Sequence, residues 1–128
     1  MTEFAAIVYA LVSVGAIGFQ LALALGAPWG TYAMGGRFPG RFPPGMRIAA
    51  VVQAALIAVM AGVVLSRADL AIPSWSETSE WAIWVVVGFS SVSLVLNAMT
   101  PSRGERLIWV PVALVQVVSS LTVALTAT

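Results

Sequence analysis

The chain lacks three residue types on which much protein chemistry depends. It contains no Cys, no His and no Lys, so all six basic residues are Arg. Without Cys neither a disulfide framework nor a thiolate metal site can form, and without His the commonest metal ligand is missing. The usual pairs of activated nucleophile and general base therefore cannot be assembled. We expect no enzyme activity, no cofactor and no metal site.

Charge is also scarce. Only 9% of the residues are charged, whereas a soluble domain has about a quarter. Hydrophobic residues make up 60% of the chain, and the mean hydropathy is +0.99. A chain of 128 residues cannot hide that much apolar surface from water in one core, so it needs lipid as its solvent. The net charge of +1, with the Arg residues scattered, gives no indication of nucleic-acid binding.

Four apolar windows are long enough to cross a membrane, which takes about 20 residues each. They are Glu3–Leu25, Met46–Leu65, Trp81–Met99 and Leu107–Ala127, and none carries a charge in its interior. The sequence therefore predicts an all-α integral membrane protein, a single domain of four transmembrane helices. Ala22-Leu23-Ala24 resembles a signal-peptide cleavage site, but a chain that starts Met-Thr-Glu lacks the positive charge of a signal peptide.

Start signals accompany the predicted helices. Ser74 with Glu77, and Ser102 with Glu105, fit the S-x-x-E capping box, in which each side chain satisfies a free backbone N–H of the first turn. Thr2 is a candidate cap for the first helix. These signals predict that the third and fourth helices begin just before their apolar windows.

The Arg residues divide unequally between the two sides of the membrane. The loops after the first and third spans hold five of them, Arg37, Arg41, Arg47, Arg103 and Arg106. The other side, made of both termini and the middle loop, holds only Arg67. Because basic residues stay on the cytoplasmic side, we expect both termini outside, in a multi-pass protein of the bacterial inner (cytoplasmic) membrane.

The two halves of the chain share a pattern of helix, turn, Arg and helix. Leu23–Ala27 and Arg47 in hairpin 1 (1–66) correspond to Leu94–Ala98 and Arg106 in hairpin 2 (70–128). Two such copies would be a tandem repeat with an axis along the membrane normal. Since the match is short and apolar, convergence of two ordinary hairpins remains an alternative.

The predicted cytoplasmic loop, residues 26–45, contains six glycines and four prolines, which rule out a regular helix. Its motif Arg-Phe-Pro occurs twice, at Arg37-Phe38 and Arg41-Phe42, and Arg47 follows. One interpretation is an interfacial loop with aromatics among the headgroups and Arg near phosphates. The other is a recognition site in which Arg37, Arg41, Arg47, Phe38 and Phe42 bind an anionic lipid or a partner.

Several short motifs are spread along the chain: Gly26-Ala27-Pro28-Trp29-Gly30, Gly35-Gly36, Pro43-Pro44 with Arg47, Thr100-Pro101-Ser102, Glu105-Arg106 and Pro111. Together they resemble those of a group of small, functionally uncharacterised four-span bacterial membrane proteins. The resemblance covers nearly the whole chain and implies the four-span topology. Because that group has no assigned function, the resemblance implies no activity, ligand or site residue.

Uncharged polar residues lie within the predicted spans, namely Gln20, Gln53, Ser90, Asn97 and Gln116. We expect Gln20 to lie near Gln53 and Ser90 near Gln116, and such groups bond across helices in lipid. The second span also carries small residues four apart, Ala50, Ala54, Ala58 and Gly62, which predict close packing on another helix. The alternative to packing is a pocket or path lined by these polar groups.

Two classes of function remain open. The first is a structural or accessory protein that binds membrane lipids or a membrane-protein partner. The second is an oligomeric carrier or channel for a small neutral solute. A homo-oligomer is expected in either case, with the Ser/Thr-rich end of the last helix, from Ser119 to Thr128, as one contact surface. A polar tunnel would favour transport, and a dry bundle would favour the accessory role.

Overall fold

The computed structural model describes all 128 residues as four long helices and short connecting segments. The helices are α1 (Thr2–Ala24), α2 (Pro44–Arg67), α3 (Ser76–Met99) and α4 (Arg103–Thr126). Three 3-10 turns lie between them: η1 (Gly30–Tyr32), η2 (Met34–Gly36) and η3 (Pro73–Trp75). All four α-helices are long and apolar enough to cross a membrane, which confirms the predicted all-α class with four candidate spans.

The helix starts follow the sequence signals only in part. Ser102 is the N-cap of α4, and its hydroxyl accepts a hydrogen bond from the backbone N–H of Glu105 at 3.2 Å. The predicted cap at Ser74 is wrong, because η3 runs directly into α3 and leaves no free first turn at that residue. The predicted cap at Thr2 is also wrong. Thr2 lies inside α1, and its hydroxyl pairs with that of Thr126.

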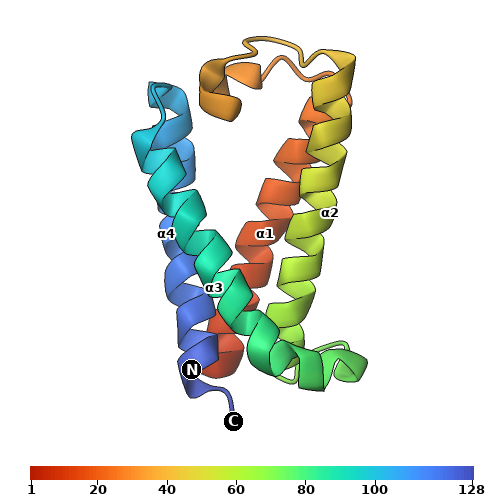
Figure 1. Cartoon of the computed structure of the whole chain (residues 1–128), viewed down its shortest axis with the longest axis vertical. Helices are drawn as coiled ribbons and strands as arrows, with labels where there is room; N and C mark the ends of the chain where they lie inside the picture. The colour runs from red at the N-terminus through yellow and green to blue at the C-terminus, as the bar shows by residue number, and fades with distance from the viewer.

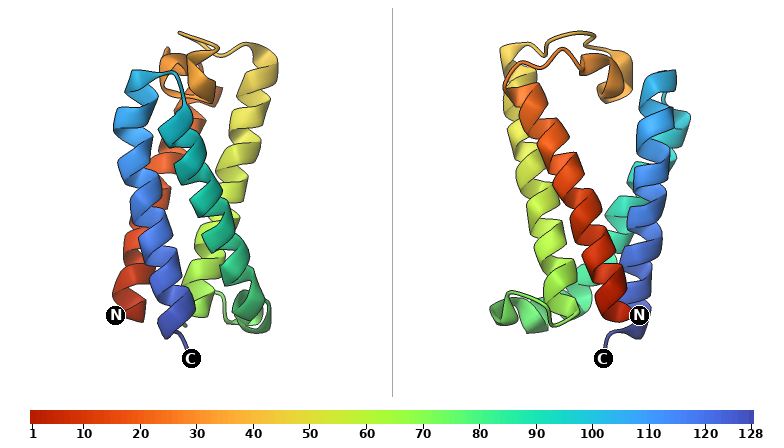
Figure 2. Two further views of the ribbon diagram at one scale, coloured as in Figure 1. Left: turned by 60° about the vertical axis from the view of Figure 1, so that its left-hand side comes forward. Right: turned by 180° about the vertical axis from the view of Figure 1, so that it is seen from behind.

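The helices form two antiparallel hairpins, α1 with α2 and α3 with α4, which meet at one end of the molecule and diverge toward the other (Figure 1). Both chain termini and the segment 68–75 lie where the hairpins meet, which we call the terminal end (Figure 2). The connections 25–43 and 100–102 lie at the opposite, loop end. The duplication of the hairpins stays a prediction.

The main core lies at the terminal end and takes residues from all four helices. Ala6 of α1, Val64 of α2, Ile83 of α3 and Val123 of α4 are fully buried in one cluster. Small side chains such as Ala let helix backbones approach closely in lipid. At the loop end the buried cluster is Leu23, Phe42 and Ala50, which belong only to the first hairpin and its loop. The two hairpins therefore share a core at one end alone.

The predicted ladder of small residues on α2 is wrong at one position. Ala50, Ala54 and Gly62 are buried, but Ala58 is exposed. A spacing of four residues drifts by about 40° per step from the 3.6-residue period, so the buried stripe continues through Ile57 instead. Gly62 is buried against Trp75 of η3 and not against another long helix, since a Cβ at Gly62 would lie 2.8 Å from the Trp75 ring.

Candidate functional site

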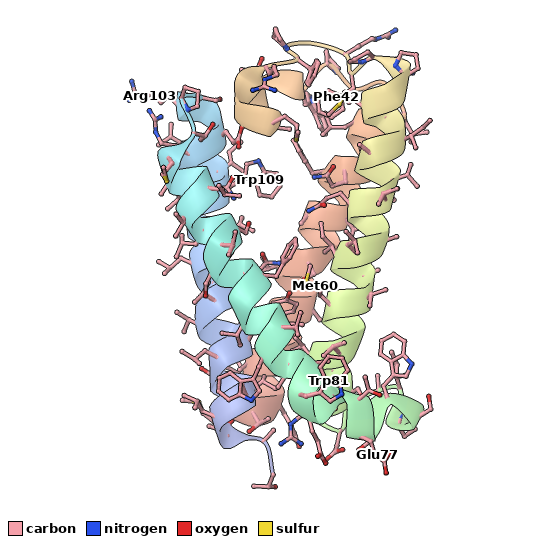
Figure 3. All side chains as sticks on the ribbon, viewed as in Figure 1. Phe42, Met60, Glu77, Trp81, Arg103 and Trp109 are labelled. Atoms are coloured by element: carbon pink, nitrogen blue, oxygen red, sulfur yellow. The ribbon has the colours of Figure 1, made fainter.

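A cavity of about 560 Å³ lies between the two hairpins. It extends from the loop end past the middle of the bundle to Tyr9 and Met60, and all four helices and the long loop contribute to its wall. The side chains of Met60 and Trp109 point into the space between the hairpins (Figure 3). The volume falls within the range of small-molecule sites in proteins, about 300–1,000 Å³.

One side of the cavity is open between α2 and α3. Val92 and Leu96 of α3 line the cavity, yet their exposed fractions are 59% and 63%. The ribbon of α3 diverges from that of α2 toward the loop end (Figure 1), and the cavity reaches the surface of the bundle at these two exposed side chains.

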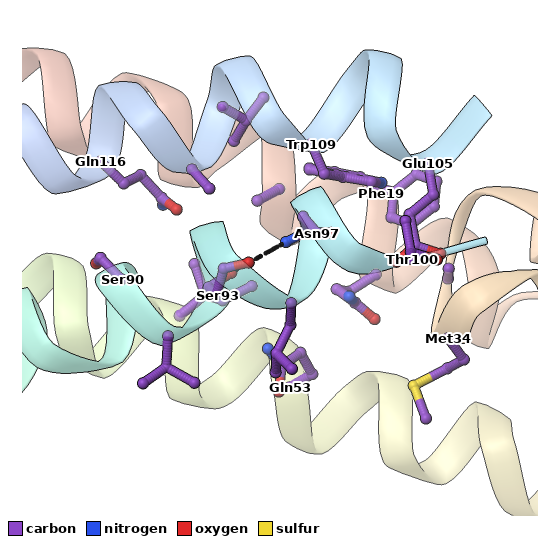
Figure 4. Close-up of a pocket in the computed structure, with 18 of the residues that line it drawn as sticks. Phe19, Met34, Gln53, Ser90, Ser93, Asn97, Thr100, Glu105, Trp109 and Gln116 are labelled. Carbon is purple, nitrogen blue, oxygen red and sulfur yellow. Dashed lines mark hydrogen bonds between the residues drawn. The ribbon is translucent and has the colours of Figure 1, made fainter. Parts of the chain in front are cut away.

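Polar groups line the cavity at successive depths (Figure 4), and they include all five residues that the sequence singled out: Gln20, Gln53, Ser90, Asn97 and Gln116. One of them bonds to another helix, since Gln116 Nε2 on α4 donates to Ser13 Oγ on α1 at 3.3 Å. Asn97 Nδ2 donates to the Ser93 carbonyl of its own helix. No hydrogen bond joins Gln20 to Gln53, so these amides keep bonding capacity for a molecule in the cavity.

The deep end of the cavity is closed by buried hydroxyl groups. The hydroxyl of Tyr9 on α1 lies beside those of Ser13 and Ser90, and all three residues are at most 2% exposed. Beyond them lies the core that all four helices share. The cavity is therefore a one-ended chamber rather than a continuous tunnel.

Residues 30–36 of the long loop, which we call the strap, cross the loop end and attach to α4. Three hydrogen bonds of 2.8 Å hold them there: Ser102 Oγ to the Thr31 carbonyl, the Gly35 N–H to Glu105 Oε2, and Trp109 Nε1 to the Tyr32 carbonyl. The three α4 partners follow one another at spacings of three and four, so they share one helix face. The strap therefore links the first hairpin to α4 at the loop end, next to the contact between Phe19 of α1 and Trp109 of α4.

Two glycines make this attachment sterically feasible. A Cβ at Gly104 on α4 would lie 2.6 Å from the ring of Tyr32. A Cβ at Gly30 would lie 1.8 Å from the carbonyl oxygen of Phe38, and the Gly30 N–H donates to the Gly40 carbonyl at 2.9 Å. Close backbone approach therefore accounts for glycine at both positions.

Glu105 is a residue whose position sequence reasoning missed. The sequence placed it in a capping box at the membrane interface, but its carboxylate bonds to the strap and lines the cavity. Its residue is 8% exposed, and no other charged side chain lines the cavity. The available signal was the helical period: Glu105 lies about three turns before Gln116, on the same face of α4.

The loop residues proposed to bind an anionic lipid or a partner fall into two groups. The guanidinium groups of Arg37 and Arg41 belong to exposed residues. Phe42 is 3% exposed and packs edge-on against Phe38 at 6.0 Å between ring centroids. Arg47 Nε donates to the Phe42 carbonyl at 2.9 Å. Phe42, Phe38 and Arg47 thus hold the loop in shape, and Arg37 and Arg41 remain available to a ligand.

The end of α4 that was expected to contact a second copy is partly used within the chain. Ser119 is 5% exposed and Ser120 is fully buried, and their hydroxyls donate at 2.6 Å to the carbonyls of Val115 and Gln116. Self-association stays a prediction, and within Ser119–Thr128 its surface would have to come from the exposed residues, such as Leu125 and Thr126.

Comparison with known protein families, with curated proteins and with solved structures found no match to this chain. The chamber offers amide and hydroxyl groups for hydrogen bonds, apolar walls for a hydrophobic body and one carboxylate near the strap. That combination suits reversible binding of a small molecule with both polar and apolar parts.

Proposed function

We propose that this chain is a membrane carrier whose cavity binds a small amphipathic molecule. The supporting observation is the one-ended chamber of about 560 Å³, lined by polar groups from all four helices. In a dry bundle these amides would be paired with one another, because unpaired polar groups are costly in hydrocarbon. A solvated or ligand-filled chamber removes that cost, which favours a carrier over a purely structural accessory protein.

The arrangement of the hairpins supports the same proposal. A chamber open at the loop end and sealed at the terminal end corresponds to one of the two access states of a carrier. The hairpins share a core only at the terminal end, so they can rock about it as two units. Closing the loop end would move α3 toward α2, and the strap would have to follow.

We further propose that the loop end faces the cytoplasm of a bacterial cell. The five Arg residues near that end, against Arg67 at the other, support this orientation. Reporter fusions at the C-terminus should be active outside the cytoplasm, and fusions near Gly40 should be active inside it. The reverse pattern would overturn the orientation without affecting the cavity.

The carrier proposal is tested by thiol labelling, because the natural chain has no Cys. A single Ser90→Cys variant, deep in the chamber, is placed in oriented proteoliposomes and exposed to a membrane-impermeant methanethiosulfonate on either face. A carrier should be labelled from both faces, since the chamber opens to each in turn. Val85→Cys, on the exposed face of α3, is the control and should stay unlabelled from both.

Labelling from the loop end alone would show a one-sided binding protein, which corresponds to the accessory role. Labelling from neither face would contradict the chamber itself. Both results would overturn the carrier proposal.

A further inference from the structure

The carboxylate of Glu105 has one oxygen without a partner in the chain. Oε2 accepts the hydrogen bond from the Gly35 N–H, whereas Oε1 makes no hydrogen bond, and the residue lines the cavity. No basic side chain lines the cavity. Arg106, next in sequence, donates instead to the Thr100 carbonyl, and Arg103 is exposed. The negative charge of this carboxylate therefore faces the chamber uncompensated by a side chain.

Aromatic rings surround the same part of the chamber. Trp109 lies one turn beyond Glu105 on α4, and the ring of Phe19 meets it edge-on at 4.7 Å between centroids (Figure 4). The ring of Tyr32 lies against Gly104, and all of these aromatic residues line the cavity. Aromatic faces attract cations, and alkylated ammonium groups are commonly bound among such rings.

We propose that the chamber recognises an organic cation, namely an amphipathic molecule with an alkylated ammonium head. This inference rests on the proposed function and specifies its substrate class. The head would lie between Glu105 and the ring of Trp109, and the apolar body would lie against Val92 and Leu96 at the lateral opening. A divalent metal ion is a poor fit, because it requires several oxygen ligands and the wall supplies one carboxylate.

The competing explanation is that Glu105 only holds the strap. Glu105→Gln separates the two, because an amide oxygen can still accept the hydrogen bond from Gly35 while the charge is lost. Glu77→Gln, at the exposed start of α3 near the terminal end, removes one carboxylate far from the chamber and serves as the matched control.

The test measures the charge preference of the chamber with a Gln53→Cys variant in lipid nanodiscs. The rates of reaction with a trimethylammonium-ethyl and a sulfonatoethyl methanethiosulfonate are compared with the rate for the uncharged hydroxyethyl reagent. The cation-to-anion rate ratio should fall about tenfold when Glu105→Gln is added, because Glu105 is the only charged side chain that lines the cavity. It should stay unchanged when Glu77→Gln is added.

An unchanged ratio in Glu105→Gln, with the uncharged reagent still reacting, would overturn the cation proposal and leave the chamber intact. If the uncharged reagent reacts no faster at Gln53→Cys than at the exposed Val52→Cys, the chamber and the proposed function fail instead.

Protection by a ligand pair gives a second measurement. Choline and its uncharged carbon analogue, dimethylbutanol, have the same shape and differ only in charge. Choline should slow the hydroxyethyl reagent at Gln53→Cys several-fold more than dimethylbutanol does, and Glu105→Gln should abolish that difference. Equal protection by both compounds in the natural chain would contradict cation recognition.

Discussion

The two ends of the bundle are packed in different ways. At the terminal end, small residues such as Ala6 and Ala82 let the four helices close on one another around Ile83 and Val64. At the loop end, the facing positions carry amides and aromatic rings, including Gln53 and Trp109, and the helices stand apart. A strap on one helix face bridges them there.

This difference shows what determines shape in a lipid-solvated protein. Lipid tails are as apolar as Leu side chains, so apolar character alone does not draw helices together. Close approach requires small residues and complementary surfaces, which the terminal end has. The loop end instead gathers polar groups that need a partner, and a chamber that admits water or a ligand supplies it. The contrast between a sealed end and an open end is therefore the feature that mutations should test.

The largest effect is expected from removing a side chain at the sealed end. Ile83→Ala deletes a fully buried side chain from the core shared by all four helices and should cost about 2–5 kcal/mol of unfolding free energy. Leu96→Ala, on the same helix at the open end, leaves a 63% exposed site and should cost under about 1 kcal/mol. Unfolding by dodecyl sulfate in mixed micelles measures both, and equal losses would contradict the contrast.

Overpacking should also separate two neighbouring positions of α2. Ala54→Leu inserts a larger side chain at a 5% exposed position and should destabilise the fold by about 1–3 kcal/mol. Ala58→Leu, one turn further along, points away from the bundle and should change the same free energy by less than about 0.5 kcal/mol. A large loss of unfolding free energy in Ala58→Leu would show that Ala58 packs against another helix, as the sequence predicted.

A smaller effect is expected from loosening the strap. Ser102→Ala removes the hydrogen bond to the Thr31 carbonyl and the cap of α4, a loss of about 0.5–2 kcal/mol. Trypsin should then cut the chain several-fold faster at Arg37 and Arg41, which follow the strap. Ser91→Ala, whose hydroxyl bonds only within α3, is the control. Unchanged cleavage in Ser102→Ala would show that the strap is held by other contacts.

The last prediction concerns lipid binding by Arg37 and Arg41, the exposed basic residues of the long loop, and not the stability of the fold. A double Arg37→Gln and Arg41→Gln variant should weaken retention of anionic lipid by about 2 kcal/mol, since each Arg near an anionic surface contributes about 1 kcal/mol. Native mass spectrometry of the purified protein measures the retained lipid. Arg47→Gln should instead loosen the loop, because it removes the bond to the Phe42 carbonyl. If the double variant retained as much anionic lipid as the natural chain, these Arg residues would serve only to orient the protein in the membrane.

The sequence predicted the elements of this fold better than their assembly. The apolar windows located the four helices to within a few residues, because spanning length is a local property of the sequence. The divergence of the hairpins depends on how faces meet across the whole bundle, and no local pattern encodes it. Ala58 was misplaced because a spacing of four residues drifts from the 3.6-residue period of the helix. Glu105 was misplaced because its partner, Gly35, is 70 residues away in the sequence.

The central claim, a chamber open at the loop end and sealed at the terminal end, is tested most directly by a thiol scan along the inward face of α2. Single Cys residues replace Gln53, Ile57 and Val64 in turn, with Val52 and Val59 as exposed, lipid-facing controls. An uncharged hydroxyethyl methanethiosulfonate should react fast at Gln53→Cys, more slowly at Ile57→Cys, and at Val64→Cys no faster than at the controls. Fast reaction at all three inward positions would show a continuous tunnel. Reaction at none of them would show a dry bundle. Either result would contradict a chamber that is open at one end and sealed at the other.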